Sequence, residues 1–574
     1  MSSARWHIAE LTDEQRRIRD RLATELSISS VSASLLVRRG LFTAEAARRF
    51  IRPSLEELND PFLMNDMCKA VDRLVSAIEA DERILVYGDY DVDGTTAVAL
   101  VYRYLAGIVG KDRLDYYIPD RYLEGYGISF AGIDYAQQSG ARLIIALDCG
   151  IRSVDKVVYA KERGIDFIIC DHHLPSTELP EAVAVLDAKR ADNAYPYREL
   201  SGCGVGFKLM QAVAKRLGRD ERTLEALLPF TAMSIASDIV PLTGENRVLA
   251  FFGLKILNGS PCAGINSLIR TAGLERGKIN ISDLVYRIGP RLNACGRVRT
   301  GRDAVRLLVT DEPMEADAIA EEVEANNSKR KDLDSSITNA ALDELRQDAD
   351  NDKRCATVVR GKDWHRGVVG IVASRLTETY FRPTIVFSED ENGMLTGSAR
   401  SVGGFDIYAA IDSCSELLTN FGGHIYAAGL SLKSDNYETF RERFERYVSE
   451  HILPEQKTEQ IEIEQELTFG EITNQFFKIL CCLEPFGPQN PRPLFVTRQV
   501  KNYRYTRCVG KEGEHLRLDA TDGTGALQGI GFGFGGLSLD FLRGGSADVC
   551  YELQPNTFNG KTTIQMLIRD IRML

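Results

Sequence analysis

The chain has 574 residues, 44% of them hydrophobic and 26% charged, and these fractions exclude a chain that is disordered along most of its length. A chain of this length is predicted to form about three to four domains. The formal net charge is −12, so the surface as a whole would repel a polyanion, and any path for one must be a locally basic groove.

The N-terminal segment and the cysteines limit the location of the protein. The first twenty residues are charged from the start, and no apolar run reaches the roughly 18 residues of a membrane span. The 12 cysteines form no C-x-x-C pair, and only Cys481 and Cys482 are close in sequence. We therefore expect no signal peptide, no membrane span, no zinc site, no disulfide framework and a cytoplasmic location.

The predicted elements begin with short helices in residues 1–70, which form an N-terminal helical extension with breaks at Pro53 and Pro61. Residues 71–310 alternate short apolar runs with helical patterns. This alternation predicts a parallel sheet covered by helices on both faces. The five strands that we expect are 84–88, 113–119, 142–147, 166–170 and 182–187.

Three further segments follow along the chain. Residues 311–353 are long and polar, with apolar residues at helical spacing, and we expect one or two connecting helices. Residues 354–453 have the pattern of a second α/β domain. In residues 454–574, short alternating segments between Gly- and Asp-rich turns predict a small β-barrel of the size of an OB-fold. The predicted fold class is therefore α/β and multidomain.

Acidic residues and histidines stand at the ends of four apolar runs. Ligands of a doubly wound sheet bind beyond the carboxyl ends of its strands, so we expect these side chains to meet at one edge. So many carboxylates repel one another unless cations neutralise them, and mixed carboxylate and imidazole ligands suit Mn²⁺ or Mg²⁺. The residues are Asp89, Asp91 and Asp93 in GDYDVDG, Asp148 in LIIALDCG, Asp171, His172 and His173 in FIICDHH, and Asp238 in MSIASDIVPL.

Each of these signals has a simpler explanation when it is taken alone. An Asp after a strand, such as Asp148, is usually a helix N-cap or a turn residue. D-x-D-x-D also occurs in calcium loops, but the Gly and Glu offsets of an EF-hand are absent here. A lone His pair is more often at the surface or satisfied in the core. The four clusters together, in this order and context, favour a site for two metal ions.

In their order, these motifs resemble those of the DHH phosphoesterases, and the chain is similar to the RecJ family within that superfamily. The resemblance implies catalytic roles for Asp148, Asp171 and His173, with His173 near the scissile phosphate and Asp148 shared between the two ions. Many relatives have a His where this chain has Tyr87, so Asp89 or water would complete one metal shell. The metal ligands implied are Asp91, Asp93, Asp148, His172 and Asp238, with Asp89 in addition.

Further segments resemble the RecJ family from about residue 40 to the end. GGHIYAAG, residues 422–429, is similar to the glycine-rich motif of the DHH-associated domain. We expect its two glycines to present backbone amides to a phosphate at a helix start, and a structural turn is the alternative. Solvated surface is the alternative for the arginines and for His365. The expected substrate contacts are Arg121, Tyr126, Arg291, Asn293, Arg297, His365, Ser398, Arg400, Gly422, Gly423 and His424.

The resemblance implies a monomeric, metal-dependent exonuclease. It would hydrolyse single-stranded DNA in the 5′-to-3′ direction to mononucleotides, in recombination and repair. A single-strand-binding protein and a RecQ-type helicase are the implied partners. Two alternatives stay open: a phosphodiesterase of short oligonucleotides or cyclic dinucleotides, and a non-catalytic single-strand-binding replication factor. The first usually lacks the extra terminal domains, and the second has lost much of its metal site.

Overall fold

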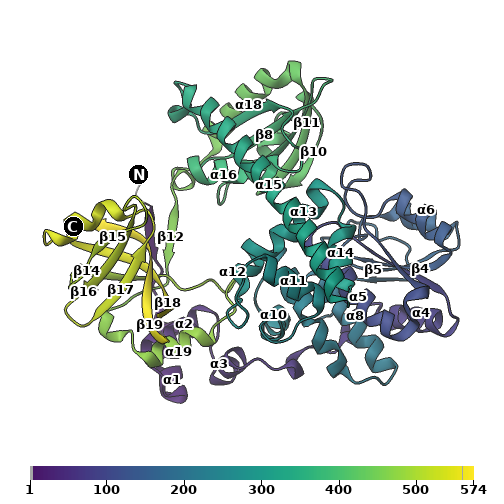
Figure 1. Ribbon diagram of the computed structural model, residues 1–574, viewed down its shortest axis with the longest axis horizontal. Coiled ribbons are helices and arrows are strands. Elements are labelled where there is room, and N and C mark those ends of the chain that lie inside the picture. Colours follow the sequence, from purple (N-terminus) through teal and green to yellow (C-terminus); the bar gives the residue numbers. More distant parts are fainter. Residues whose placement is uncertain (1–3, 559) are drawn as a thin grey trace. The chain divides into compact units, whose positions relative to one another are not determined.

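The computed structural model describes residues 4–558 and 560–574, which divide into two compact units. The first unit contains residues 61–238 and 253–459, and the second contains residues 4–60, 239–252 and 460–574. Figure 1 labels many of their helices and strands. Among the described residues, no helix combines the length and the apolar character that crossing a membrane requires.

A five-stranded parallel sheet lies at the centre of residues 61–238. Its strand order is β3-β2-β4-β5-β6, and all neighbouring strands are parallel, as predicted. The strands are β2 (Arg83–Gly88), β3 (Leu114–Tyr117), β4 (Ala141–Leu147), β5 (Asp166–Cys170) and β6 (Ala184–Leu186). The helices are α4 (Met67–Glu79), α5 (Val92–Val109), α6 (Phe130–Ser139), α7 (Val154–Lys161), α8 (Gly202–Arg216) and α9 (Leu228–Ser237).

Burial on both faces explains the continuous apolar runs of these strands. Leu85 and Ile144 belong to a hydrophobic cluster with side chains from α6 and α7. Their sequence neighbours Val86 and Ile145 point to the opposite face and are also fully buried. Because both faces are covered, polar side chains gather at the carboxyl edge, where the strands end.

Helices occupy residues 253–347 of the first unit. They include α11 (Ala263–Thr271), α12 (Ile281–Asp283), α13 (Gly289–Val298) and α14 (Arg302–Val309). The predicted connector is one helix, α15 (Pro313–Gln347). Helix α15 packs against α11, α13 and α14, and its residues Ile337 and Leu345 share a cluster with α16 (Val369–Tyr380). The connector therefore has a buried face along its length.

A mixed five-stranded sheet follows the connector, in the order β10-β11-β9-β8-β7, with only the pair β7 and β8 parallel. Gly422 and Gly423 lie in β10, which turns directly into β11. The predicted helix start at these glycines is therefore wrong, because the motif forms a β-hairpin. The elements are β7 (Thr357–Lys362), β8 (Thr384–Glu389), β9 (Met394–Arg400), β10 (Leu418–His424), β11 (Ala427–Lys433), α17 (Ile407–Asp412) and α18 (Tyr437–His451).

The second unit is built on a β-barrel. Strands β14, β18, β19, β17 and β16 pair in sequence, and an additional pairing of β14 with β16 closes the ring, as in an OB-fold (yellow in Figure 1). The strands are β12 (Gln460–Ile463), β13 (Gln465–Glu466), β14 (Phe495–Asn502), β15 (Arg507–Val509), β16 (His515–Thr521), β17 (Ala526–Gly531), β18 (Ser546–Phe558) and β19 (Lys561–Met573).

N-terminal elements complete this second unit. Val31 and Leu35 of α2 share a core with Phe495 and Tyr551 of the barrel. A short strand that no sequence pattern predicts, β1, pairs in parallel with β12. The remaining elements are β1 (Arg5–Ile8), α1 (Asp13–Leu26), α2 (Ser30–Arg38), α3 (Ala44–Ile51), α10 (Gly244–Leu257), which begins in this unit, α19 (Asn474–Cys482) and α20 (Ser538–Leu542).

Candidate metal centre and substrate site

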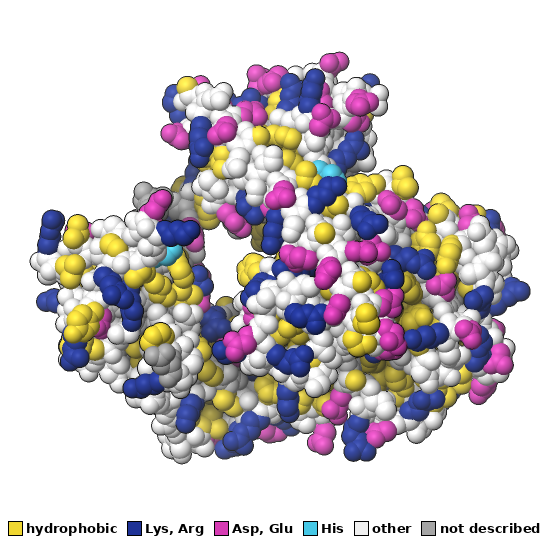
Figure 2. Space-filling view, in the orientation of Figure 1, with side chains coloured by type: hydrophobic (Ala, Val, Ile, Leu, Met, Phe, Trp, Pro, Cys, Tyr) yellow, Lys and Arg dark blue, Asp and Glu magenta, His cyan; other side chains and the backbone are white. Residues whose placement is uncertain are grey.

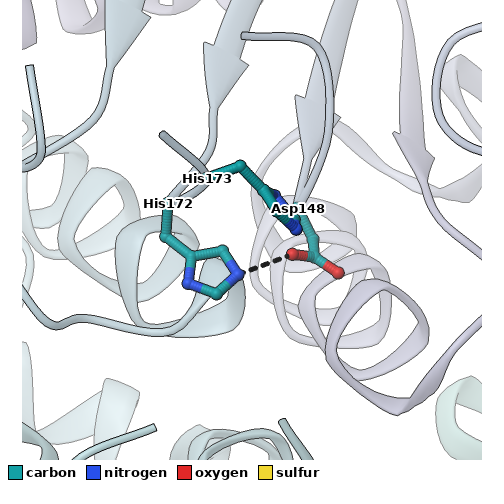
Figure 3. A group of neighbouring side chains, drawn as sticks. All are labelled: Asp148, His172 and His173. Atoms are coloured by element: carbon teal, nitrogen blue, oxygen red, sulfur yellow. Dashed lines mark ion pairs between the residues drawn. The ribbon is translucent and has the colours of Figure 1, made fainter. Parts of the chain in front are cut away.

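Three carboxylates surround one imidazole nitrogen at the carboxyl edge of the parallel sheet. His172 Nε2 lies 3.2 Å from Asp148 Oδ1, 3.5 Å from Asp238 Oδ2 and 3.7 Å from Asp93 Oδ2. Asp148 follows β4, His172 follows β5, Asp93 is in the first turn of α5, and Asp238 is the C-cap of α9. Figure 3 shows the contact between Asp148 and His172. All four predicted clusters therefore contribute a side chain here.

Asp148 has an unusual backbone conformation. Its φ is 58°, in the left-handed region that residues other than glycine seldom adopt. The start of α8 packs directly against it: a Cβ at Gly202 would lie 2.6 Å from the Asp148 Cβ. Glycine is therefore required at position 202, and the strained conformation of Asp148 is held by its surroundings, as is common at functional sites.

Asp93 is oriented by three hydrogen bonds. The backbone N–H groups of Gly202 and Cys203 each donate to its carboxylate at 2.8 Å, and Ser234 Oγ donates at 2.8 Å. No sequence motif predicts these contacts. One signal was available, because Ser234 precedes Asp238 by four residues and so shares a helix face with it.

Asp89 and Asp91 flank Tyr90 in the loop between β2 and α5. Asp91 Oδ1 accepts a hydrogen bond from Gly94 N at 3.1 Å, so Asp91 is also the N-cap of α5. Asp89 Oδ1 accepts from Gly127 N at 3.2 Å. Tyr87 donates its hydroxyl to Gly127 O at 3.0 Å, and this contact belongs to the 119–129 loop rather than to the carboxylates.

Burial and mutual repulsion shift the pKa values of these carboxyl groups upward. Burial, followed by the neighbouring Asp91, raises the pKa of Asp89 to about 8. Burial, followed by Asp93, raises the pKa of Asp238 to about 8 and that of Asp148 well above its usual range. Asp89, Asp148 and Asp238 are therefore costly to ionise in the protein alone, and nearby cations would reverse this cost.

Unused ligand atoms allow a direct test of whether a cation fits. Asp148 Oδ1, Asp89 Oδ2 and both ring nitrogens of His172 are buried, and none has a hydrogen-bond partner among the residues that the structure describes. Buried polar atoms are rarely left unpaired in proteins. Two groups have the spacing of a metal site: Asp93, His172 and Asp238, and Asp148, His172 and His173. Carboxylate oxygen and imidazole nitrogen are ligands that suit Mn²⁺, and the residues present fit a divalent cation.

His173 stands beside this cluster and is held by two neighbours. Its Nδ1 lies 2.8 Å from Asp171 Oδ1, and its Nε2 lies 3.1 Å from the Tyr126 hydroxyl. Burial alone would raise the pKa of Asp171, but hydrogen bonding from His173 and Ile151 N holds it at about 2. Asp171 is therefore an ionised partner that orients His173. The Tyr126 hydroxyl also donates to the backbone carbonyl of Asp148 at 3.2 Å.

Three arginines without acidic partners lie near the Tyr90 side of the cluster. Arg121 lies over the Tyr90 ring, 4.9 Å from its centroid. Arg297 Nη1 donates to Gly367 O at 2.6 Å, and Arg400 Nη1 donates to Ser398 Oγ at 3.0 Å. Burial, and then the charge of Arg121, lower the pKa of Arg400 and bring that of Arg297 to about 10. We call Arg121, Arg297 and Arg400 the arginine group.

Acidic side chains do not neutralise the positive charges of the arginine group within the part of the chain that the structure describes. None of its three members, which are all half-buried, forms an ion pair there, whereas the buried Arg190 and Arg291 do. On the face shown in Figure 2, Lys and Arg side chains lie among Asp and Glu, and neither sign covers a large continuous area. The group is therefore a local concentration of positive charge in a chain whose formal net charge is −12.

The other predicted substrate residues have varied positions. Arg291 is buried in an ion pair with Glu324 at 2.5 Å, and Asn293 is half-buried on α13. The His365 ring is 6.2 Å from that of Tyr122, whose hydroxyl donates to Arg297 O at 2.6 Å. Gly422, Gly423 and His424 are exposed on β10. His365 and Tyr122 thus lie next to the arginine group, whereas Arg291 already has a partner.

Comparisons with known proteins agree with this geometry. The DHH family, N-terminal domain, matches residues 83–235, the DHHA1 domain matches residues 351–450, and the RecJ OB domain matches residues 463–570. The fold and the carboxylate cluster therefore define a multidomain protein of the DHH class.

Relatives that match nearly the whole chain show to which family of the DHH class it belongs. Single-stranded-DNA-specific exonuclease RecJ of Bacillus subtilis is 34% identical over 99% of this chain and 71% of its own length. The RecJ of Escherichia coli is 33% identical over 94% of this chain and 95% of its own. The crystal structure of RecJ in complex with Mn²⁺ from Thermus thermophilus has a TM-score of 0.83 at 27% identity, covering 99% of this chain and 79% of that one. The chain belongs to the RecJ family.

Proposed function

We propose that the protein is a metal-dependent exonuclease that hydrolyses single-stranded DNA from the 5′ end and releases mononucleotides. The observation that carries this proposal is the pairing of two charged sites. Buried carboxylates with unused ligand atoms lie beside three arginines that have no acidic partners among the described residues. The first suits divalent cations, and the second suits phosphate groups of a nucleic-acid strand.

Two Mn²⁺ or Mg²⁺ ions are the proposed cofactors, with Asp148 as a ligand shared between them. When bound, such ions lower the pKa of water and stabilise the charge of a phosphoryl transition state. Relatives have been crystallised with Mn²⁺ and with Mg²⁺. The proposed ligands are Asp89, Asp91, Asp93, Asp148, His172 and Asp238.

The chain's own residues position the strand. The arginine group would bind a phosphate with Ser398, because guanidinium groups donate paired hydrogen bonds to phosphate oxygens. His173, oriented by Asp171, would contact the scissile phosphate, and Tyr126 would place its half-exposed ring against a base or sugar. Arg291, Asn293, His365, Gly422, Gly423 and His424 are proposed as further contacts. The polarity of cleavage comes from the RecJ resemblance and not from this geometry.

The proposal extends to the setting in which the enzyme acts. RecJ resemblance supports a monomer that acts in the cytoplasm in recombination and repair. A single-strand-binding protein and a RecQ-type helicase are the proposed partners, since an exonuclease of single strands needs duplex DNA to be opened. Co-purification of the tagged chain with either protein would test this part.

Digestion of end-labelled DNA tests the function. Single strands labelled at the 5′ or the 3′ end are incubated with Mn²⁺, Mg²⁺ or EDTA, with duplex DNA and Asp148→Ala as controls. We expect the 5′-labelled strand to release labelled mononucleotide at once. We expect no release in EDTA, from duplex DNA or with the Asp148→Ala variant. Cleavage of dinucleotides but not of long strands would contradict the proposal and favour a short-oligonucleotide phosphodiesterase.

A further inference from the structure

A cavity of about 390 Å³ opens beside the histidines of the metal cluster. Its lining includes Asp171, His172 and His173 but none of the four carboxylates Asp91, Asp93, Asp148 and Asp238. The cavity therefore adjoins the cluster on its histidine side, whereas Arg121 of the arginine group stacks on Tyr90, between Asp89 and Asp91. Its volume is at the lower end of the range for small-ligand sites.

The walls of the cavity suit a flat, partly apolar ligand. Ile151 and Cys149 form buried apolar surface, while Leu174 and Tyr126 also line the cavity although they are 64% and 52% exposed. Large apolar side chains left exposed beside a polar site often mark a binding surface. An exposed tyrosine ring is a common platform for a nucleobase.

Two cationic side chains, Lys189 and Arg152, also line the cavity, as does the imidazole of His424. Lys189 and Arg152 form no ion pair within the described part of the chain, although they lie close to a strongly acidic cluster. Arg152 uses its Nε for the carbonyl of Leu174, at 2.9 Å, which fixes the side chain at the edge of the cavity. The Lys189 side chain is half-buried, and its charge acts on Asp238, Asp187 and His172.

We propose that this cavity binds the nucleoside on the far side of the scissile phosphate from the arginine group, with Lys189 and Arg152 contacting the next phosphate of the same strand. This inference rests on the proposed function, because it assumes a strand that crosses the metal cluster. Positive charge then lies on both sides of the cluster, and a strand needs at least three nucleotides to reach both. Contacts to phosphate position a strand regardless of its sequence, so the subsite would accept any base.

Substrate length tests the subsite. A 5′-phosphorylated dinucleotide lacks the phosphate that Lys189 and Arg152 would contact, and a trinucleotide contains it. We expect kcat/KM to rise about tenfold from the dinucleotide to the trinucleotide, the factor given by 1.4 kcal/mol of added binding. In Lys189→Gln this ratio should fall toward one, and Lys189→Arg should restore most of it. Removing the base of the nucleotide assigned to the cavity should also lower the rate of the wild type.

Binding without catalysis separates failure of the subsite from failure of the proposed function. Fluorescence anisotropy of a labelled oligothymidine in EDTA should show a salt dependence that is weaker by about one phosphate contact in Lys189→Gln. Lys161→Gln is the matched control, since Lys161 is exposed and pairs with Glu181 outside the cavity. An unchanged length ratio and salt dependence in Lys189→Gln would overturn the subsite. A wild type that binds strands but cleaves none would overturn the proposed function instead.

Discussion

The carboxylate cluster and the arginine group depart in opposite ways from the usual pairing of charges in proteins. In the cluster, buried oxygens of Asp89 and Asp148 have no hydrogen-bond partner within the described part of the chain, and burial raises the pKa values of both residues. In the arginine group, burial lowers the pKa values of Arg297 and Arg400, and no carboxylate pairs with them among the described residues. Each site is electrostatically incomplete without a ligand of the opposite charge.

No ion pair joins the carboxylate cluster to the arginine group among the described residues. Elsewhere in the same unit, Arg291 pairs with Glu324 and Arg73 pairs with Asp166 and Glu82. Keeping unpaired charge costs stability, and such costs are typical of functional sites. We infer from this difference that the carboxylate cluster suits cations and the arginine group suits phosphates, as the proposed complex of metal ions and a nucleic-acid strand requires.

Replacing Asp148, the proposed shared metal ligand, should have the largest effect on DNA cleavage. Asp148→Asn keeps the size of the side chain, and Asn tolerates the left-handed conformation at this position. We expect cleavage of single-stranded DNA to fall about a thousandfold, because several kcal/mol of transition-state stabilisation are lost at 1.36 kcal/mol per factor of ten. Steady-state kinetics measures this, with Asp519→Asn, which alters a buried carboxyl group in the second unit, as control. Equal losses in the two variants would contradict the assignment.

Removing a hydrogen bond to Asp93, a proposed metal ligand, should have a smaller effect, on the affinity for metal. Ser234→Ala removes the hydroxyl that donates to Asp93 at 2.8 Å. We expect the affinity for Mn²⁺ to fall about 10-fold to 100-fold, the usual result of removing a hydrogen bond to a metal ligand. Titration calorimetry measures the affinity. Ser237→Ala is the matched control, because the Ser237 hydroxyl lies on the same helix and has no hydrogen-bond partner among the described residues. The Mn²⁺ affinity of this variant should stay unchanged.

Neutralising the arginine group should weaken strand binding without removing metal binding. For Arg400→Gln we expect about a tenfold loss of affinity for single-stranded DNA, and a salt dependence reduced by about one phosphate contact. Anisotropy titrations at several salt concentrations measure both. Arg366→Gln, which removes an exposed arginine paired with Asp390 at 2.9 Å, serves as control. A loss of similar size in the control would show that the charge acts only through the overall field of the protein.

The smallest expected effect is a change of thermal stability with pH. The folded pKa values of Asp89 and Asp238, about 8, exceed the unfolded values, so the folded state holds more protons between about pH 4 and pH 8. These groups therefore make the metal-free protein less stable as pH rises through that window. Mn²⁺ should remove their contribution by holding the carboxylates ionised. Tm values measured in EDTA and in Mn²⁺ at pH 6 and pH 8 would contradict this if their difference did not grow with pH.

Much of the site could be predicted from the sequence because it follows the ends of strands. Asp148 and His172 come directly after buried apolar runs, and parallel strands bring such positions to one edge. The contacts that hold Asp93 could not be predicted in this way. They come from backbone amides at Gly202 and Cys203, whose hydrogen bonds depend on how α8 packs and leave no pattern in side-chain type.

The fold, like the site, could be predicted only in part from the sequence. The five strands of the parallel sheet were predictable because each is a short apolar run between helical patterns. The sequence does not distinguish a helix start from a hairpin at Gly422 and Gly423, because paired glycines occur in both. Only the pairing of β10 with β11 decides that this segment is a hairpin. Strand β1 could not be predicted, since four residues gain their structure only from pairing with β12, more than 450 positions away.

Counting bound ions tests the central claim most directly. Equilibrium dialysis of the metal-free protein against Mn²⁺ gives the number of ions per chain, and the same measurement is made on Asp148→Asn. We predict two ions for the wild type and a lower number, or a greatly weakened second ion, for the variant, because Asp148 is the ligand that we propose both ions share. A wild type that binds no Mn²⁺, or a variant that binds two ions with unchanged affinity, would contradict a metal centre built on Asp148.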